Sequence, residues 1–275
     1  MLKFFKTWTL PISMLAGAIG YFVFANVTFL EPAKPFMYTL IAYLTPFLIF
    51  AQLLLTFCKI SVRELMPSPW HGWLLLIQAV SSLVLAALLL WLPMREEYRD
   101  VFEGAMVCLI CPTATAAAVI TGKLGGSASS LTTYTLLSNL LAAIVVPLVF
   151  PLVEPHAEIT FFAAFLKILG KVFPLLLFPF FLALFLRRFI PPIHRFLAGL
   201  RDMAFYLWAV ALAIVTGQTV KSLVNSEAEI YVEILIALGG LITCIAQFYW
   251  GKRIGKKYNA VSYTHLRAHE TELHL

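Results

Sequence analysis

The sequence predicts an all-α polytopic membrane protein, and two observations predict it: the composition and the length of the apolar segments. Of the 275 residues, 61% are hydrophobic and only 12% are charged, and the mean hydropathy is +0.89. Soluble domains are about half apolar and about one quarter charged. Several apolar segments also reach the roughly 20 residues that a helix needs to cross a bilayer. We therefore expect membrane-spanning helices and not a soluble fold.

We expect about eight transmembrane helices, separated by short polar or charged turns. The first follows Lys3 and Lys6 but is not a signal peptide, because no small-residue cleavage site comes after it. Lys167 and Lys171 predict an amphipathic helix over Phe161–Lys171 that lies along the interface. The expected spans are Trp8–Asn26, Pro35–Lys59, Trp70–Pro93, Val101–Gly122 with a break at Pro112, Ser127–Val153, Val172–Leu186, Met203–Val224 and Ile230–Trp250.

The distribution of basic residues predicts a cytoplasmic amino terminus, because cytoplasmic loops carry an excess of Lys and Arg. With this orientation the expected cytoplasmic residues are Lys3, Lys6, Lys59, Arg63, Lys123, Arg187, Arg188, Arg195, Arg201, Lys252, Arg253, Lys256 and Lys257. The smaller set expected outside is Lys34, Arg95, Arg99, Lys167, Lys171 and Lys221. We expect a multi-pass protein of the bacterial inner (cytoplasmic) membrane. The same basic clusters are explained by topology and not by a nucleic-acid partner.

Polar side chains gather around the expected break in the fourth span. Proline removes a backbone donor and clashes with the preceding turn, so Pro112 predicts a broken or kinked helix. Small hydroxyl residues after such a proline, here Thr113 and Thr115, are typical of a discontinuous helix that lines a cavity. Freed carbonyls and helix ends can bind a cation or a carboxylate there. Alternatively, the threonines bond back to the backbone and heal a simple kink.

The fifth span is unusually rich in hydroxyl groups. Thr135, Ser138 and Asn139 have the i, i+3, i+4 spacing that places side chains on one face of a helix. Such a face could present several oxygens to one cavity, although small polar residues also join helices without binding anything. Asn139 is the sharpest candidate, because a mid-membrane amide without a partner is costly.

Four glutamines lie in four different apolar segments, and each amide must find a donor and an acceptor. Each of them either binds a solute or bridges two helices. Our preferred binding candidates are Gln78 and Gln218, with Gln52 and Gln247 as the other two. The candidate substrate- and ion-binding residues are therefore Gln78, Pro112, Thr113, Thr115, Thr135, Ser138, Asn139 and Gln218.

Catalytic chemistry has little support in the sequence, so we expect neither an enzyme nor a cofactor. No Asp or Glu lies in the middle of an expected span, where proton or cation coupling usually uses one. His71, His156 and His194 fall in expected loops without partners. The four cysteines lie in apolar segments without the paired spacing of a zinc site or a disulfide framework.

The segment around Pro112 resembles the crossing helix of the bile acid:sodium symporter superfamily, which reads Cys-Pro-Gly-Gly-Thr-Ala-Ser-Asn. This chain reads Cys111-Pro112-Thr113-Ala114-Thr115-Ala116-Ala117-Ala118, followed by Val119-Ile120-Thr121 and a turn at Gly126. Cys111, Pro112, Thr115 and Ala116 match in register. The resemblance implies ten helices in two inverted five-helix repeats. It also implies a panel domain and a core domain whose broken helices cross at the substrate site.

The resemblance also implies how the chain is divided. Residues 1–153 would form the first five-helix repeat, with its broken helix at 108–121, and residues 154–260 an incomplete second repeat of three helices. After about Ala260 the chain turns polar and resembles translated sequencing-adapter sequence. We therefore expect 261–275 to be a non-native tail that stands where the second crossing helix would begin.

The function that the resemblance implies is secondary active transport of a small organic anion by alternating access. Sodium would be the coupling ion, with Thr135 at the position of a family ligand threonine and Gln78 near the family's ion-binding glutamine. The family's Ser-Asn pair falls on Ala117 and Ala118, and a following serine falls on Leu131. Two alternatives stay open: a membrane-embedded sensory or scaffold module, and a proton-coupled carrier of the auxin-efflux type.

Overall fold

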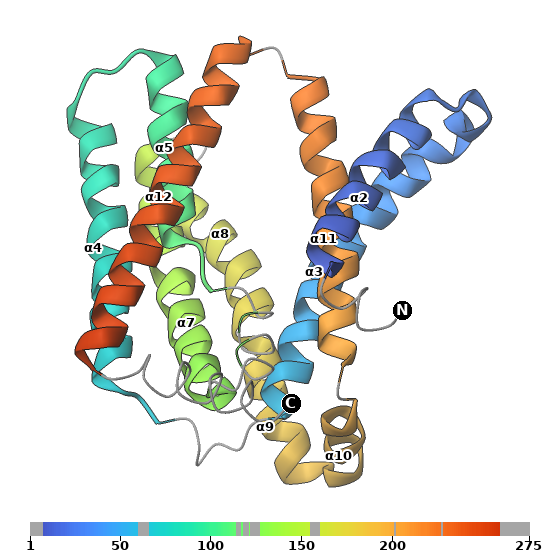
Figure 1. Ribbon diagram of the computed structural model, residues 1–275, viewed down its shortest axis with the longest axis vertical. Coiled ribbons are helices and arrows are strands. Elements are labelled where there is room, and N and C mark those ends of the chain that lie inside the picture. The colour runs from blue at the N-terminus through green and yellow to red at the C-terminus, as the bar shows by residue number, and fades with distance from the viewer. Residues whose placement is uncertain are drawn as a thin grey trace, which may run out of the picture. The chain divides into compact units, whose positions relative to one another are not determined.

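A computed structural model describes residues 8–59, 66–113, 117, 121, 127–154, 160–200, 202–226 and 228–258. Within these residues the regular structure consists of ten α-helices and one 3-10 helix (Figure 1). Six helices are long and apolar enough to cross a membrane, and a bent helix pair raises the number to seven. The prediction of an all-helical, polytopic membrane protein is confirmed. The expected tail lies outside the described residues.

The helices of membrane-spanning length are α2 (Thr9–Asn26), α3 (Lys34–Cys58), α4 (Pro69–Trp91), α7 (Ala128–Val153), α11 (Met203–Val224) and α12 (Ile230–Lys257). Their bounds lie within a few residues of those predicted, except that α12 continues to Lys257. The shorter elements are η1 (Thr28–Ala33), α5 (Glu96–Ile110), α8 (Phe161–Leu176), α9 (Phe178–Phe189) and α10 (Pro191–Gly199).

One of the eight predicted spans needs correction, and another is described only in part. The first half of the fourth is the 15-residue helix α5, which ends directly before Cys111-Pro112, and most of its expected second half lies outside the described residues. The sixth is the pair α8 and α9, bent by 43°. The prediction of a separate helix that ends at Lys171 is wrong, because α8 continues through Lys171 to Leu176. The break comes at Leu177, between Pro174 and Pro179.

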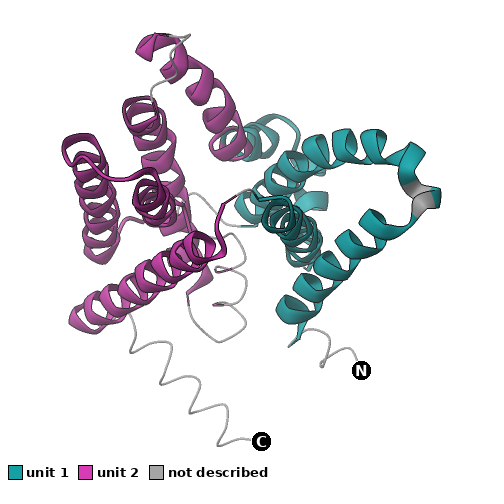
Figure 2. Cartoon of the chain, turned by 90° about the horizontal axis from the view of Figure 1, so that it is seen from above, with its two compact units in different colours: residues 1–59, 181–227 teal, residues 60–180, 228–275 magenta. Residues whose placement is uncertain are grey.

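The chain forms two compact units that alternate along the sequence (Figure 2). Unit 1 comprises residues 1–59 and 181–227, and unit 2 comprises residues 60–180 and 228–275. In unit 1, α11 packs against both α2 and α3, and α10 contacts α3. In unit 2, α4 contacts α5 and α7, while α12 packs on α5 and α8 packs on α7.

Helices α2 and α11 approach each other so closely that only glycine fits at the contact. A Cβ atom on Gly17 would lie 2.9 Å from the carbonyl carbon of Ala213 and still closer to its oxygen. A Cβ atom on Gly217 would lie 3.0 Å from the carbonyl oxygen of Gly17. Small residues commonly allow membrane helices to pack backbone against backbone. These three residues therefore determine how α2 and α11 pack.

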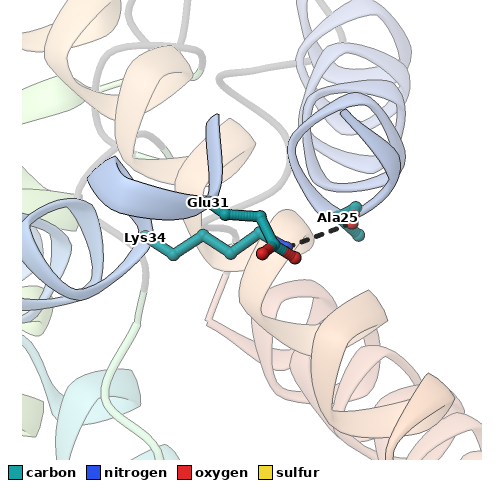
Figure 3. A network of polar contacts seen from close by, with 3 residues as sticks. All are labelled: Ala25, Glu31 and Lys34. Atoms are coloured by element: carbon teal, nitrogen blue, oxygen red, sulfur yellow. Dashed lines mark hydrogen bonds and ion pairs between the residues drawn. The ribbon is translucent and has the colours of Figure 1, made fainter. Parts of the chain in front are cut away.

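The turn between α2 and α3 is fastened by one lysine (Figure 3). The Lys34 ammonium donates to the carbonyl oxygen of Ala25 at 3.3 Å and lies 3.4 Å from a carboxylate oxygen of Glu31. Ala25 is in the last turn of α2, where carbonyl groups lack partners within the helix and attract cations. Lys34 thereby joins the start of α3 to the end of α2.

The core of unit 2 forms where α4, α5 and α7 meet. Its buried side chains are Ala86 and Leu89 from α4, Met106 and Ile110 from α5, and Val145, Val149 and Val153 from α7. Near the other end of α5, Arg99 pairs with Glu103 at 2.9 Å and donates to the carbonyl of Val153. Because Ile110 is both a core residue and the last residue of α5, this packing fixes the position of the helix end.

Candidate functional site

The fourth span breaks where the sequence predicts it. Helix α5 ends at Ile110, and Cys111 has φ −54° and ψ 129°, an extended conformation typical of a residue before proline. The predicted break at Pro112 is thus confirmed. The last carbonyls of an α-helix have no partner in their own helix. The break therefore leaves backbone oxygens for other groups to bind inside the apolar part of unit 2.

One glutamine from α4 occupies this helix end. The side-chain nitrogen of Gln78 donates to the carbonyl oxygens of Ile110 at 2.9 Å and Cys111 at 3.3 Å. Its side-chain oxygen accepts a hydrogen bond from the hydroxyl of Ser138 at 3.1 Å. Gln78 is buried. A single amide therefore connects α4 to the end of α5 and to α7.

Ser138 also contacts the residue after Pro112. The backbone nitrogen of Thr113 donates to the Ser138 hydroxyl oxygen at 3.4 Å, and Ser138 is fully buried. We refer to the five residues Gln78, Ile110, Cys111, Thr113 and Ser138 as the polar centre. Each carbonyl oxygen in it has two lone pairs, so it can accept from Gln78 and bind a further group.

The neighbouring polar residues of α7 are also buried. Thr135 and Asn139 are buried like Ser138, which agrees with the predicted common face. The Thr135 hydroxyl donates to the carbonyl oxygen of Leu131 at 2.9 Å, within its own helix. The side-chain nitrogen of Asn139 has no hydrogen-bond partner among the described residues, although Asn139 is only 2% exposed. Asn139 therefore has an unused donor in a buried position.

The structure brings together some of the predicted site residues and not others. Gln78, Thr113 and Ser138 meet in the polar centre, and Pro112 adjoins it. Thr115 lies outside the described residues. Gln218 belongs to unit 1, where it lines an open pocket of about 380 Å³ together with Lys221, Ser222, Asn225 and Ser226.

The other two glutamines differ in their surroundings. Gln247 of α12 donates to the carbonyl oxygen of Cys108 at 3.2 Å. This bond joins α12 to α5, as expected of an amide that bridges helices. Gln52 is buried in α3, and its side-chain oxygen has no hydrogen-bond partner among the described residues.

His71 was predicted to lie in a loop without partners, and that prediction is wrong. It lies in the first turn of α4, where the backbone nitrogen of Ser68 donates to Nδ1 at 3.0 Å. Its Nε2 atom lies 3.2 Å from the hydroxyl oxygen of Ser130 on α7. Because Nδ1 accepts, Nε2 carries the proton and donates to Ser130. His71 falls at the start of the expected span Trp70–Pro93, and the Ser68-Pro69 pair is a helix-start signal that agrees with that span and not with a loop.

His194 likewise lies in a helix, α10, while His156 is outside the described residues.

A comparison with protein-family models finds a match to the family described as Sodium Bile acid symporter family, over residues 45–226. The matched range is more than half of the chain and includes the whole polar centre. No curated protein matches the chain.

Proposed function

Because the chain belongs to the sodium bile acid symporter family, we propose that it is a secondary active transporter of a small organic anion. Sodium is the coupling ion in this proposal, and transport proceeds by alternating access. Membership of a transporter family, and not of an enzyme family, is the premise. The single observation that carries the proposal is the break of α5 at Pro112, with Gln78 and Ser138 bound to its end.

The polar centre has the oxygen atoms that a sodium site needs. The end of α5 carries partial negative charge, because the peptide dipoles of a helix point their carbonyls toward its carboxyl end. Unwound carbonyls and helix ends of this kind coordinate sodium in carriers with discontinuous helices. The Ile110 and Cys111 carbonyls, the Gln78 amide oxygen and the Ser138 hydroxyl supply such oxygens. Thr135 remains a proposed further ligand.

All of these oxygens are neutral, which bears on the choice of coupling ion. Proton coupling usually needs an intramembrane group that titrates. The sequence contains no Asp or Glu between Glu103 and Glu154, so neither the fifth span nor the part of the fourth that adjoins the polar centre has a carboxylate for that role. We therefore favour sodium over the proton that drives an auxin-efflux-type carrier.

The proposed anion contacts are hydrogen-bond donors near the centre. Leaving a buried donor unpaired costs about 1–3 kcal/mol, so the side-chain nitrogen of Asn139, which none of the described residues pairs with, needs a partner. A carboxylate oxygen of the substrate would provide one. Thr113, with Pro112 setting its backbone, and Thr115 are proposed to contribute as well. Gln218 remains a proposed binding residue of unit 1.

The division of the chain supports alternating access and the proposed repeats. Within residues 1–153, α2 and α3 lie in unit 1 while α4, α5 and α7 lie in unit 2. Within residues 154–260, α8 lies in unit 2, α10 and α11 lie in unit 1, and α12 lies in unit 2. Each proposed repeat therefore contains a step from unit 1 to unit 2, which two related repeats would share. In such carriers one body moves against the other around a fixed site.

The polar centre can be tested with two glutamines that make similar bonds. Gln78→Ala removes the amide from the centre, whereas Gln247→Ala removes an amide that binds α5 at Cys108. The purified protein is heated in sodium chloride and in potassium chloride. We expect sodium to raise the melting temperature of the parent and of Gln247→Ala but not of Gln78→Ala, because a ligand stabilises only the fold that binds it.

Uptake into proteoliposomes tests the same variants for transport, with a radiolabelled bile acid as the first probe. We expect sodium-driven uptake that Gln78→Ala abolishes and Gln247→Ala retains. Full sodium-dependent uptake by Gln78→Ala would exclude the proposed site. Uptake driven by a proton gradient alone would replace sodium coupling with the auxin-efflux-type alternative. Binding without counterflow would favour the sensory or scaffold module.

A further inference from the structure

The segment 187–200 joins α9 to α11 and contains the short helix α10. On a helical projection Ile193, Phe196 and Leu197 fall on one side of α10, and His194 and Arg195 fall on the opposite side. An amphipathic helix of this pattern, with Arg opposite aromatic and aliphatic residues, is typical of helices that lie in the membrane interface. The pattern differs from that of α9 and α11, which are apolar over most of their length.

The apolar side of this segment is largely uncovered. Phe189 and Phe196 are each 68% exposed and Ile193 is 47% exposed, and α10 has no buried residue although it contacts α3. Large exposed apolar side chains are costly in water. The segment lies within a few residues of two helices, α9 and α11, whose apolar surfaces belong in a bilayer. The acyl chains and headgroups of that leaflet are therefore its immediate surroundings.

The charge of the segment is exclusively positive. Arg187, Arg188 and Arg195 are exposed, and in the described part of the chain the ion pairs with carboxylates do not involve them. The sequence has no Asp or Glu from Phe161 to Arg201. Burial and the neighbouring Arg187 lower the pKa of His194, so at neutral pH the arginines carry the charge.

We propose that residues 187–200 form a docking surface for the anionic phospholipids of the leaflet in which α9 ends and α11 begins. Guanidinium groups bind phosphate oxygens through two parallel hydrogen bonds, and the exposed apolar side chains enter the acyl region beside them. Because α10 contacts α3, this surface holds unit 1 at the level of the headgroups. The inference does not depend on the transported solute or the coupling ion.

Two double variants that remove the same charge separate this surface from general electrostatic attraction. Arg187→Gln/Arg195→Gln removes two charges from the segment. Lys167→Gln/Lys171→Gln removes two exposed charges from α8 in unit 2. The protein is placed in nanodiscs of equal parts phosphatidylglycerol and phosphatidylcholine, and the bound lipid is measured by native mass spectrometry. A symmetric bilayer makes the result independent of orientation.

We expect the parent and the lysine variant to retain phosphatidylglycerol in preference to phosphatidylcholine. The apparent affinity of the arginine variant for phosphatidylglycerol should fall about fivefold per arginine, or roughly 30-fold in total, since each surface cation contributes on the order of 1 kcal/mol. Equal retention of both lipids by the parent, or undiminished preference in the arginine variant, would overturn the proposal.

Two further measurements distinguish a lipid leaflet from a free phosphate. Phosphatidylglycerol in mixed micelles should raise the melting temperature of the parent, whereas soluble glycerol phosphate at the same headgroup concentration should not. Ile193→Ser/Phe196→Ser keeps the three arginines but removes two exposed apolar anchors, and it should lose part of the lipid-induced shift. If glycerol phosphate gives the full shift, the segment is an anion site and not a membrane-docking surface.

Discussion

At the scale of single residues, Ser138 is the point on which the polar centre depends. Its hydroxyl donates to Gln78 and accepts from the backbone of Thr113, so it holds two helix segments at once. A residue at this position must keep a hydroxyl group to make both bonds. The side-chain nitrogen of its neighbour Asn139 has no partner in the described part of the chain. There, the pair combines one satisfied and one unsatisfied polar group on the same turn of α7.

Ser138→Ala should weaken the use of sodium without unfolding the protein. The substitution removes one of the proposed sodium ligands, and an interaction with a charged group is worth about 1.5–3 kcal/mol. We expect the sodium concentration for half-maximal uptake to rise by about tenfold or more, because 1.4 kcal/mol is a factor of ten. Ser138→Thr keeps the hydroxyl and should restore much of the affinity. Sodium titration of uptake in proteoliposomes measures both.

Ser82→Ala is the matched control for this prediction. Ser82 is as completely buried as Ser138, but its hydroxyl bonds to the carbonyl oxygen of Ala79 in its own helix. It should therefore leave the sodium dependence unchanged. An equal loss in both variants would mean that Ser138 acts through packing and has no specific role at the centre.

The sequence predicts which residues gather in the polar centre better than it predicts their partners. Gln78, Thr113 and Ser138 could be selected because polar groups are costly in apolar segments. Their bonds could not be predicted, since they join α4, the end of α5 and α7. Gln218 has the same residue type and setting in sequence, yet it lines a pocket of unit 1. Residue type alone does not distinguish the two.

At the scale of elements, the contact between α2 and α11 tolerates the least change in side-chain size. Gly17→Ala would force the new methyl group against the backbone of Ala213, so the helices must separate. Overpacking of this kind typically costs about 1–3 kcal/mol. We expect a lower melting temperature in detergent, with unit 1 affected first.

Gly20→Ala provides the control on the same helix. A Cβ atom on Gly20 meets nothing within 4 Å, and alanine favours a helix by about 1 kcal/mol over glycine. This variant should be neutral or slightly more stable. If Gly17→Ala behaved in the same way, the close approach of the two backbones would be disproved.

The prolines show why some helix breaks can be predicted from the sequence and others cannot. Pro112 was expected to break the fourth span, and α5 ends two residues before it. Pro147 and Pro151, in contrast, lie inside the continuous helix α7. Neighbouring helices can satisfy the carbonyl groups that a proline leaves free, so a proline alone does not specify a break. The bend at Leu177 was missed because the lysines of α8 suggested an interfacial helix instead.

At the scale of the whole molecule, each unit should behave as one body during transport. A Cβ atom on Gly240 would lie 3.7 Å from the sulfur of Cys108, so a cysteine there can reach Cys108 after a rotation of the Cys108 side chain. Gly240→Cys, with the other three native cysteines replaced by alanine, should therefore cross-link α12 to α5 on oxidation. Because both helices belong to unit 2, uptake should persist after cross-linking.

Gly239→Cys is the control, because a Cβ atom there faces Val101 and should not reach Cys108. Gel mobility before and after reduction reports the cross-link, and uptake is measured on the same sample. Cross-linking of Gly240→Cys that stops uptake reversibly would show that α5 and α12 move against each other, which contradicts a unit that moves as one body.

The way the units alternate along the chain has a consequence for biosynthesis. Helix α2 is made early, but its close partner α11 emerges only after all of α4, α5, α7 and α8. Contacts between distant parts of a chain form late, so α2 must wait in the lipid or beside the insertion machinery. Its glycine-containing face is exposed during that time. A ribosome that pauses before Met203 would leave unit 1 unassembled and open to degradation, while most of unit 2 is already present.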